Sequence, residues 1–232
     1  MATEINIHPV QAEVLKVLLF NPKSKYSKLN TTGITSDHFN FHIQKLLRLG
    51  LVEKVEQKYR LTTKGKEFAN RFDTEEVKIE RQAKTAVMVV CTRFKGRSRE
   101  FLMQQRLKEP YFGFYGAISG KIKWGETVAQ AASRELKEET GLKANLKLCG
   151  IEHKLDYFKE DSLLEDKYFY IFAARDPEGI LKKNFEGGKN IWVQEKDVSK
   201  LANLFDDILD IYKMLRQKKL TFVEKKYKVS RY

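Results

Sequence analysis

The chain has 232 residues, of which 42% are hydrophobic and 32% are charged. This length suits one large domain or two small ones, and either can bury a core. The longest apolar runs, such as 86–91, are too short to cross a bilayer, and the amino terminus lacks the basic and apolar regions of a signal peptide. We therefore expect a soluble cytoplasmic protein without a membrane partner.

The two cysteines, Cys91 and Cys149, each lie in a strand-like apolar run, and neither belongs to a CxxC or Cys/His cluster. We expect two buried thiols and no disulfide framework or zinc site. The formal net charge of +13 is uneven, because residues 213–232 hold eight Lys or Arg against one Glu. Such an excess favours a polyanionic partner, which could be a nucleotide, a nucleic acid or an anionic surface.

Residues 1–75 show a succession of short elements. Helical periodicity over 10–18 ends near Asn21-Pro22, a short element follows at 24–29, and Ser36 could cap a helix that stops at Gly50. Alternation over 51–55 and 59–62 predicts a hairpin, and 64–72 predicts another helix. This order, with the stretch SDHFNFHIQKLLRLGLVEK followed by YRLTTKGKEF, resembles a winged helix-turn-helix domain.

The resemblance implies that the third helix enters the major groove of DNA and that the hairpin meets phosphates. The implied DNA-binding residues are Ser36, His38, Asn40 and His42 on the helix, and Lys58 and Arg60 in the hairpin. Winged helices also serve as interaction or dimerisation modules, and residues 1–80 carry only thirteen basic against ten acidic residues. The sequence therefore leaves open whether this domain binds DNA or another protein, and whether the chain forms a homodimer.

A highly charged segment, 76–83, is the predicted linker, and strand patterns begin after it. Strands are predicted at 85–94, 100–106, 146–153, 168–174 and 190–193, and a final helix at 198–217. The basic tail, 218–232, mixes Lys and Arg with aromatic residues. We expect it to be disordered, with nucleic-acid contact or an added edge strand as alternatives.

The segment GKIKWGETVAQAASRELKEETGL, residues 120–142, carries the strongest signal. Thr127 and Gln130 form a capping box and Gly141 suits a left-handed helix end, so a helix is predicted over 128–140. Glu135, Glu138 and Glu139 then share one face, where they repel each other and oppose the helix dipole. A hard divalent cation would relieve this cost, whereas the simpler alternative is a solvated acidic face with Arg134 paired to Glu138.

At every defined position this spacing resembles the Nudix box. The resemblance implies an α/β/α sandwich over 84–217, so the predicted fold class is α+β, with an N-terminal winged helix domain followed by a Nudix domain. It also implies Mg²⁺ or Mn²⁺ held by Glu135, Glu138 and Glu139, with Glu135 also able to act as a base and Arg134 orienting the glutamates. Ser119, where relatives commonly have glycine, would supply a carbonyl ligand, and Glu165, Asp166 and Glu186 are candidates for a further ligand or base.

Three residues outside the helix are predicted to contact substrate. Arg106 could reach a phosphate, although a surface ion pair is the alternative, and Phe114 could stack on a base or belong to the core. Trp124 lies in the loop of the box. The predicted function is Mg²⁺-dependent hydrolysis of a phosphoanhydride in a nucleoside diphosphate derivative. The alternative is a transcription regulator whose Nudix domain senses a nucleotide-type metabolite.

Overall fold

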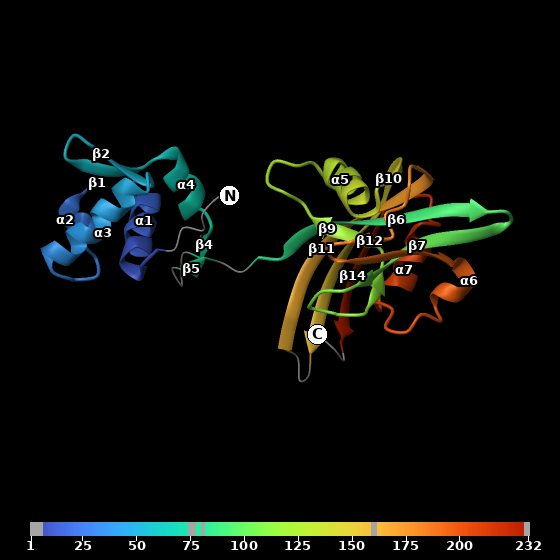
Figure 1. Cartoon of the computed structure of the whole chain (residues 1–232). Coiled ribbons are helices and arrows are strands. Elements are labelled where there is room, and N and C mark those ends of the chain that lie inside the picture. The colour runs from blue at the N-terminus through green and yellow to red at the C-terminus, as the bar shows by residue number, and fades with distance from the viewer. Residues whose placement is uncertain (1–6, 74–77, 80–81, 159–161, 230–232) are drawn as a thin grey trace. The chain divides into compact units, whose positions relative to one another are not determined.

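The structure is a computed structural model that describes residues 7–73, 78–79, 82–158 and 162–229. The chain forms two compact units, Met1–Arg81 and Gln82–Tyr232, which are described separately (Figure 1). Within these described ranges, no helix has the length and apolar character that a membrane span requires.

The first unit contains four helices and a three-stranded sheet among its described residues. Its elements are α1 Pro9–Phe20, β1 Ser24–Lys25, α2 Tyr26–Leu29, α3 Ser36–Arg48, β2 Val52–Val55, β3 Lys58–Leu61 and α4 Thr63–Ala69. The sheet has the order β1-β3-β2. Leu15, Phe39, Ile43 and Leu46 are fully buried in the core. This order of elements is the one expected from the sequence, while the assignment as a DNA-binding winged helix remains a prediction.

The predicted linker only partly falls within the described residues. Phe72–Asp73 (β4) pairs with Lys78–Ile79 (β5), whereas residues 74–77 and 80–81 lie outside the described ranges.

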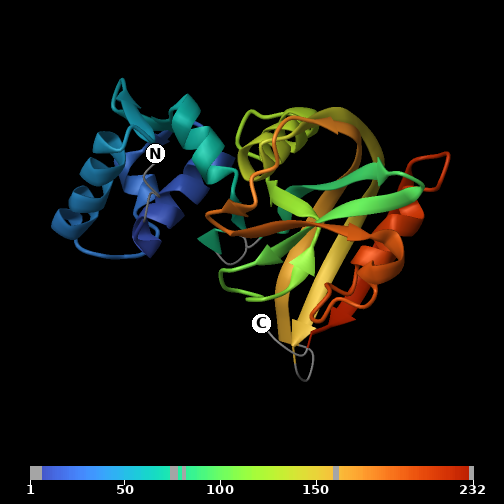
Figure 2. The ribbon, with the colours of Figure 1, turned by 45° about the vertical axis from the view of Figure 1, so that its right-hand side comes forward.

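The second unit is built on a nine-stranded sheet. Its strands are β6 Lys84–Lys95, β7 Ser98–Arg106, β8 Tyr115–Gly116, β9 Ile118–Lys121, β10 Lys143–Phe158, β11 Ser162–Glu178, β12 Asn184–Phe185, β13 Gly188–Gln194 and β14 Thr221–Lys228. The path of the sheet is β12-β13-β7-β6-β11-β10-β14. β6 runs parallel to β11 and β14 runs parallel to β10, whereas the other pairs are antiparallel. Figure 2 shows the long, curved pair β10 and β11.

The sheet forks between β6 and β7. These strands pair with each other near their turn, from Thr92 to Phe101, and beyond that point β9 pairs with β6 while β8 pairs with β7. The segment that carries β8 and β9 leads directly into the loop before α5 (Val128–Thr140). The fork therefore brings the start of the box against the centre of the sheet.

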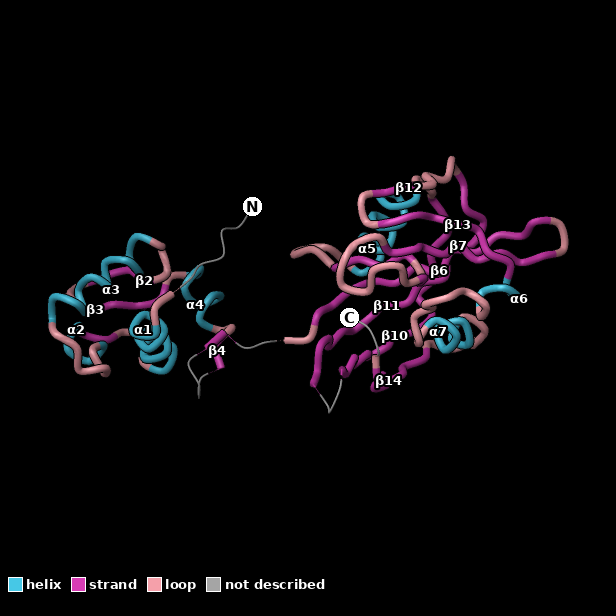
Figure 3. Tube along the Cα trace, turned by 60° about the horizontal axis from the view of Figure 1, so that its bottom comes forward, coloured by secondary structure: helices cyan, strands magenta, loops and turns pink. Residues whose placement is uncertain are grey.

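Side chains of β6 alternate between two cores, as the strand geometry requires. Val87, Val89 and Cys91 pack toward α5. Ala86, Met88 and Val90 pack on the other face, toward α6 (Glu195–Val198) and α7 (Ile208–Met214). Figure 3 shows α5 and α7 on opposite sides of the sheet, which gives the expected α/β/α layering. Both cysteines are buried free thiols, as expected.

Two expectations for the carboxyl-terminal region are wrong. The helix predicted over 198–217 is broken, because the chain takes a left-handed turn at Asn203 and exchanges backbone hydrogen bonds with Tyr115 before α7 begins. The tail is not disordered over 221–228, where it forms the edge strand β14 that was the alternative. Residues 230–232 lie outside the described ranges.

Candidate active site

The helix α5 and the loop before it follow from their sequence. Thr127 caps the helix and makes the reciprocal capping box with Gln130, and Gly141 ends it in the left-handed conformation with φ of 77°. In β9, a Cβ on Gly120 would lie 1.9 Å from the carboxyl carbon of Glu135. Only glycine lets the backbone approach this carboxylate so closely.

Arg134 holds three carboxylates together. Its guanidinium donates to both oxygens of Glu126, at 2.6 and 2.8 Å, and to Glu135 Oε1 at 2.5 Å. Its contact with Glu138 is longer, at 3.3 Å, and Glu138 is 55% exposed. The hydrogen bonds from Arg134 and from the backbone N–H of Lys123 lower the pKa of Glu126 to about 2. The loop is thereby fixed to the helix by a charged pair that stays ionised near neutral pH.

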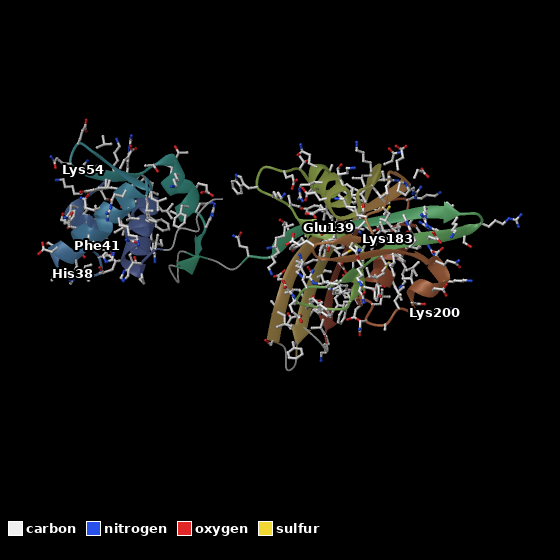
Figure 4. The ribbon with its side chains drawn as sticks, viewed as in Figure 1. His38, Phe41, Lys54, Glu139, Lys183 and Lys200 are labelled. Atoms are coloured by element: carbon white, nitrogen blue, oxygen red, sulfur yellow. The ribbon has the colours of Figure 1, made fainter. Side chains whose placement is uncertain are left out.

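Glu139, labelled in Figure 4, lies one turn after Glu135 on the helix and is not held by Arg134 in any contact among the described residues. Burial, together with the charge of Glu135, raises its pKa to about 7, although a hydrogen bond with Gln104 favours the ionised form. Its Oε2 atom is buried and has no hydrogen-bond partner among the described residues. An unpaired buried oxygen of this kind is costly and calls for a cation or a proton.

A cleft of about 680 Å³ opens along the fork of the sheet and contains Glu135 and Glu139. This volume is in the range of small-molecule sites. Ser119 and Gly120 of β9 line it beside the two glutamates, and Arg106 and Lys108 line it at the end of β7. The cleft therefore combines carboxylates with cationic side chains, as a phosphate ester and its counter-ion require.

The three glutamates of the box lie in different surroundings, and their role as metal ligands stays a prediction. Within the ranges that the structure describes, no three His, Cys, Asp or Glu side chains are grouped to hold a metal ion. Arg134 contacts Glu135 and Glu138, and Glu138 is 55% exposed, whereas Glu135 and Glu139 line the cleft. The donor set still fits a hard divalent cation, because Glu135 and the unpaired oxygen of Glu139 face the same cleft.

The three predicted substrate-binding residues lie in different places. Arg106 lines the cleft, where its guanidinium is held by the backbone carbonyls of Glu109 and Pro110. Phe114 is half-buried and packs against Tyr111 and Phe205, which line the cleft, but Phe114 itself is not among the lining residues. Trp124 is 91% exposed and borders a separate hollow beside Arg134, so it also lies outside the cleft.

The three candidates for a further ligand or base lie in different surroundings. Glu165 lines the cleft and is paired with Lys84, at 2.8 Å, and with Lys167, at 3.5 Å. Asp166 bonds His153, and Glu186 is exposed in the turn between β12 and β13. Of the three, Glu165 lines the same cleft as Glu135 and Glu139.

Sequence reasoning missed a buried polar network on the inner wall of the cleft. Lys154 Nζ donates to Asp207 Oδ2 at 2.9 Å and lies 3.6 Å from Asp156, and Tyr111 donates to Asp156 at 2.8 Å. Glu152 accepts a hydrogen bond from Tyr227 of β14 at 3.0 Å. One signal was available, since Glu152, Lys154 and Asp156 alternate along one strand, but the predicted strand stopped at His153.

In the first unit, most predicted DNA contacts are on the surface. Ser36, His38, Asn40, Lys58 and Arg60 are exposed, although Arg60 is paired with Glu53 at 2.7 Å. His42 differs, because it is half-buried and stacks on His8, and burial lowers its pKa. Phe41, which is 58% exposed on the same helix, was not predicted (Figure 4).

Comparison with known proteins decides the family of the second unit. A family model described as the NUDIX domain matches residues 82–215. The chain belongs to the NUDIX domain family. The mutator protein MutT of Bacillus halodurans has a similar structure, with a TM-score of 0.53 and 23% identity over 64% of this chain and 93% of that one. The NUDIX domain of Shewanella oneidensis NrtR, solved in complex with ADP ribose, is also similar in structure. Its TM-score is 0.52, and its sequence is 18% identical over 67% of this chain and 97% of that one.

A curated relative of this NUDIX protein is the octanoyltransferase of Myxococcus xanthus. It is 37% identical over 113 residues, which are 48% of this chain and 31% of the relative. The chain thus spans about a third of that relative's length. The two structural likenesses show a shared fold, and the family match supports a pyrophosphohydrolase.

Proposed function

We propose that the second unit hydrolyses a phosphoanhydride in a nucleoside diphosphate derivative and depends on Mg²⁺ or Mn²⁺. The observation that supports this most directly is the cleft, in which Glu135 and Glu139 of the box face Arg106 and Lys108. A polyanionic substrate needs cationic partners, and the carboxylates need a cation of their own.

Each group has a part in this proposal. Glu135 and Glu139 would hold the cation, which would neutralise the diphosphate and activate the attacking water. Arg134 positions Glu135 through its 2.5 Å hydrogen bond, and it fixes the loop through Glu126. Arg106 and Lys108, which line the same cleft, attract the phosphate. Water then adds across the P–O–P bridge, so that one P–O bond breaks and two phosphate products leave.

The test is a product-resolved screen of nucleoside diphosphate derivatives with Mg²⁺ or Mn²⁺. Glu139→Gln should lower hydrolysis by at least about 100-fold without unfolding the protein. Glu178→Gln is the matched control, because Glu178 is exposed at the end of β11 and does not line the cleft, so that the rate should stay unchanged. The proposal fails if the wild type cleaves no member of the panel, or if the two variants behave alike.

The second candidate function is transcription regulation through the first unit. It is favoured by exposed His38 and Asn40 on α3 and by Lys58 in the hairpin, which suit major-groove and phosphate contacts. Sequence-selective DNA binding that weakens with salt and responds to a nucleotide would support this function. Indifference to DNA at low salt would instead favour an interaction module.

A further inference from the structure

The inner wall of the cleft carries a charged network to which the proposed hydrolysis assigns no step. Lys154 and Asp156 project from one face of β10, and Asp207 reaches them from the residue just before α7. All three line the cleft, yet they are 5%, 2% and 2% exposed. Buried charges at a cavity wall are expensive, which makes this network a candidate for binding.

Each aspartate of the network uses only one of its two oxygens. Asp207 Oδ2 accepts from Lys154 at 2.9 Å, and Asp156 Oδ2 accepts from Tyr111 at 2.8 Å. Asp156 Oδ1 and Asp207 Oδ1 are buried and have no hydrogen-bond partner in the part of the chain that the structure describes. Lys154 Nζ is 3.6 Å from Asp156 Oδ1 and so lies between the two carboxylates.

This arrangement pairs two unused acceptors with one ammonium donor. Burial opposes the charge of Lys154, but Asp207, Asp156 and Glu152 together outweigh it and raise its pKa, so the ammonium stays charged. Three remaining features limit the ligand: Lys154 lies between two aspartates, Tyr111 orients Asp156, and the aromatic ring of Phe205 lies 5.3 Å from the ammonium. Lys84, Lys167 and Glu165 line the same cleft, and burial raises the pKa of Asp156, so the charges of this wall nearly balance. A nearly neutral wall with unused acceptors favours a neutral group rich in hydroxyls over a phosphate.

We propose that Asp156, Lys154 and Asp207 bind the vicinal diol of a sugar in the substrate. Each hydroxyl donates to one unused carboxylate oxygen, and the ammonium donates to a hydroxyl oxygen, so that the acceptors and the donor are all satisfied. Carboxylates recognise ribose hydroxyls in the same chemical way in dinucleotide sites. The assignment of the diphosphate to the part of the cleft that Arg106 and Lys108 line rests on the proposed function.

A vicinal diol could belong to the ribose of the nucleoside or to a sugar attached to the outer phosphate. The probe is therefore ADP-ribose, which contains both, with two matched analogues: one lacks the 2′-hydroxyl of the adenosine and the other lacks the 2-hydroxyl of the distal ribose. Titration calorimetry of the full chain in EDTA measures binding without turnover. One analogue should bind at least about tenfold more weakly than ADP-ribose, and that analogue identifies the sugar.

The same titrations with Asp156→Asn and Asp207→Asn should abolish the difference between ADP-ribose and the weaker analogue. Asp206→Asn is the matched control, because Asp206 is exposed beside Asp207, and it should keep the difference. Thermal melting shows whether each variant folds. If one variant does not fold, the binding of the two analogues to the wild type still tests whether a diol is recognised.

Equal binding of all three ligands to the wild type would overturn the proposal, as would a difference that survives in both Asp variants. Diol-selective binding without hydrolysis would refute only the proposed hydrolase activity. Hydrolysis without diol selectivity would refute only the proposed role of the network.

Discussion

At the scale of single residues, Arg134 does more than pair with one glutamate. Its guanidinium contacts Glu126, Glu135 and Glu138, and it also donates to the carbonyl of Lys121 in β9 at 3.1 Å. A planar fork with five donors can make these contacts, whereas a lysine ammonium can satisfy only some of them. Arg134 therefore ties the helix, the loop and the strand at the place where Glu135 meets Gly120.

We expect Arg134→Lys to lower kcat by about 10–100-fold, because Glu135 loses the contact that orients it. The effect should fall on kcat and not on KM, since Arg134 does not line the main cleft. Steady-state kinetics on the substrate found in the panel measure it, with Lys137→Arg on the same helix as a control. An unchanged kcat would show that Glu135 keeps its position without the guanidinium.

Glu152 provides a pH prediction that is independent of catalysis. Burial, and after it the negative charge of Asp207, raises the pKa of this carboxyl above its usual 4.5. Below about pH 4.5 the group is protonated in both the folded and unfolded chain. Above that value the unfolded chain loses its proton first, so the free energy of unfolding falls as pH rises toward the folded-state pKa.

Glu152→Gln removes this titration while keeping an oxygen that can accept from Tyr227. The variant should gain on the order of 1–3 kcal/mol over the wild type between pH 5 and pH 8. Urea unfolding in EDTA at several pH values measures the gain. A constant difference across the pH range would mean that Glu152 ionises normally in the folded protein.

At the scale of elements, β14 completes the sheet that carries the network. Its backbone pairs in parallel with β10 from Gly150↔Thr221 to Tyr157↔Lys228. Tyr227 is 5% exposed, and its hydroxyl satisfies one oxygen of Glu152. On the surface, Glu224 bonds His153 of the neighbouring strand at 2.6 Å.

Deletion of residues 218–232 should lower the melting temperature of the second unit by more than about 5 °C, because it exposes the edge of β10 and removes the partner of Glu152. Phe222→Ala in the full chain is the control, since Phe222 is 61% exposed and its loss should shift the melting temperature by less than about 2 °C. Differential scanning calorimetry distinguishes these outcomes. Equal melting temperatures of the truncated and full chains would show that β14 does not stabilise the second unit.

The sequence predicted the elements whose signals are local. Thr127, Gln130 and Gly141 define both ends of α5, and the box spacing indicated the glutamates. The break in the final helix was not predicted, because Leu201, Leu204 and Phe205 have helical spacing. The backbone pairing with Tyr115 that interrupts the helix depends on a segment almost ninety residues earlier in the chain. The pairing of Lys154 with Asp207 was not predicted for the same reason, since only the fold brings the ammonium and the carboxylate to 2.9 Å from each other.

At the scale of the whole molecule, the catalytic candidates belong to the second unit alone. Every residue that lines the cleft falls between Lys84 and Ile208, and the two cores beside the sheet draw on the same unit. Each unit therefore has what an independently folding domain needs.

We expect a fragment of residues 82–232 to hydrolyse the same substrate with a kcat within about threefold of the full chain. Parallel kinetics and thermal melts of the two proteins measure this. A fragment that melts normally but loses more than about tenfold in kcat would show that residues 1–81 contribute to the reaction.

The position of β14 has a consequence for biosynthesis. The strand β10 acquires its outer neighbour only after some sixty further residues have been translated, since β10 ends at Phe158 and β14 begins at Thr221. Until then, the nascent chain presents an open, partly apolar edge that includes Ile151 and Leu155. The first unit, whose contacts are complete much earlier, can fold on the ribosome while the second still awaits its last strand.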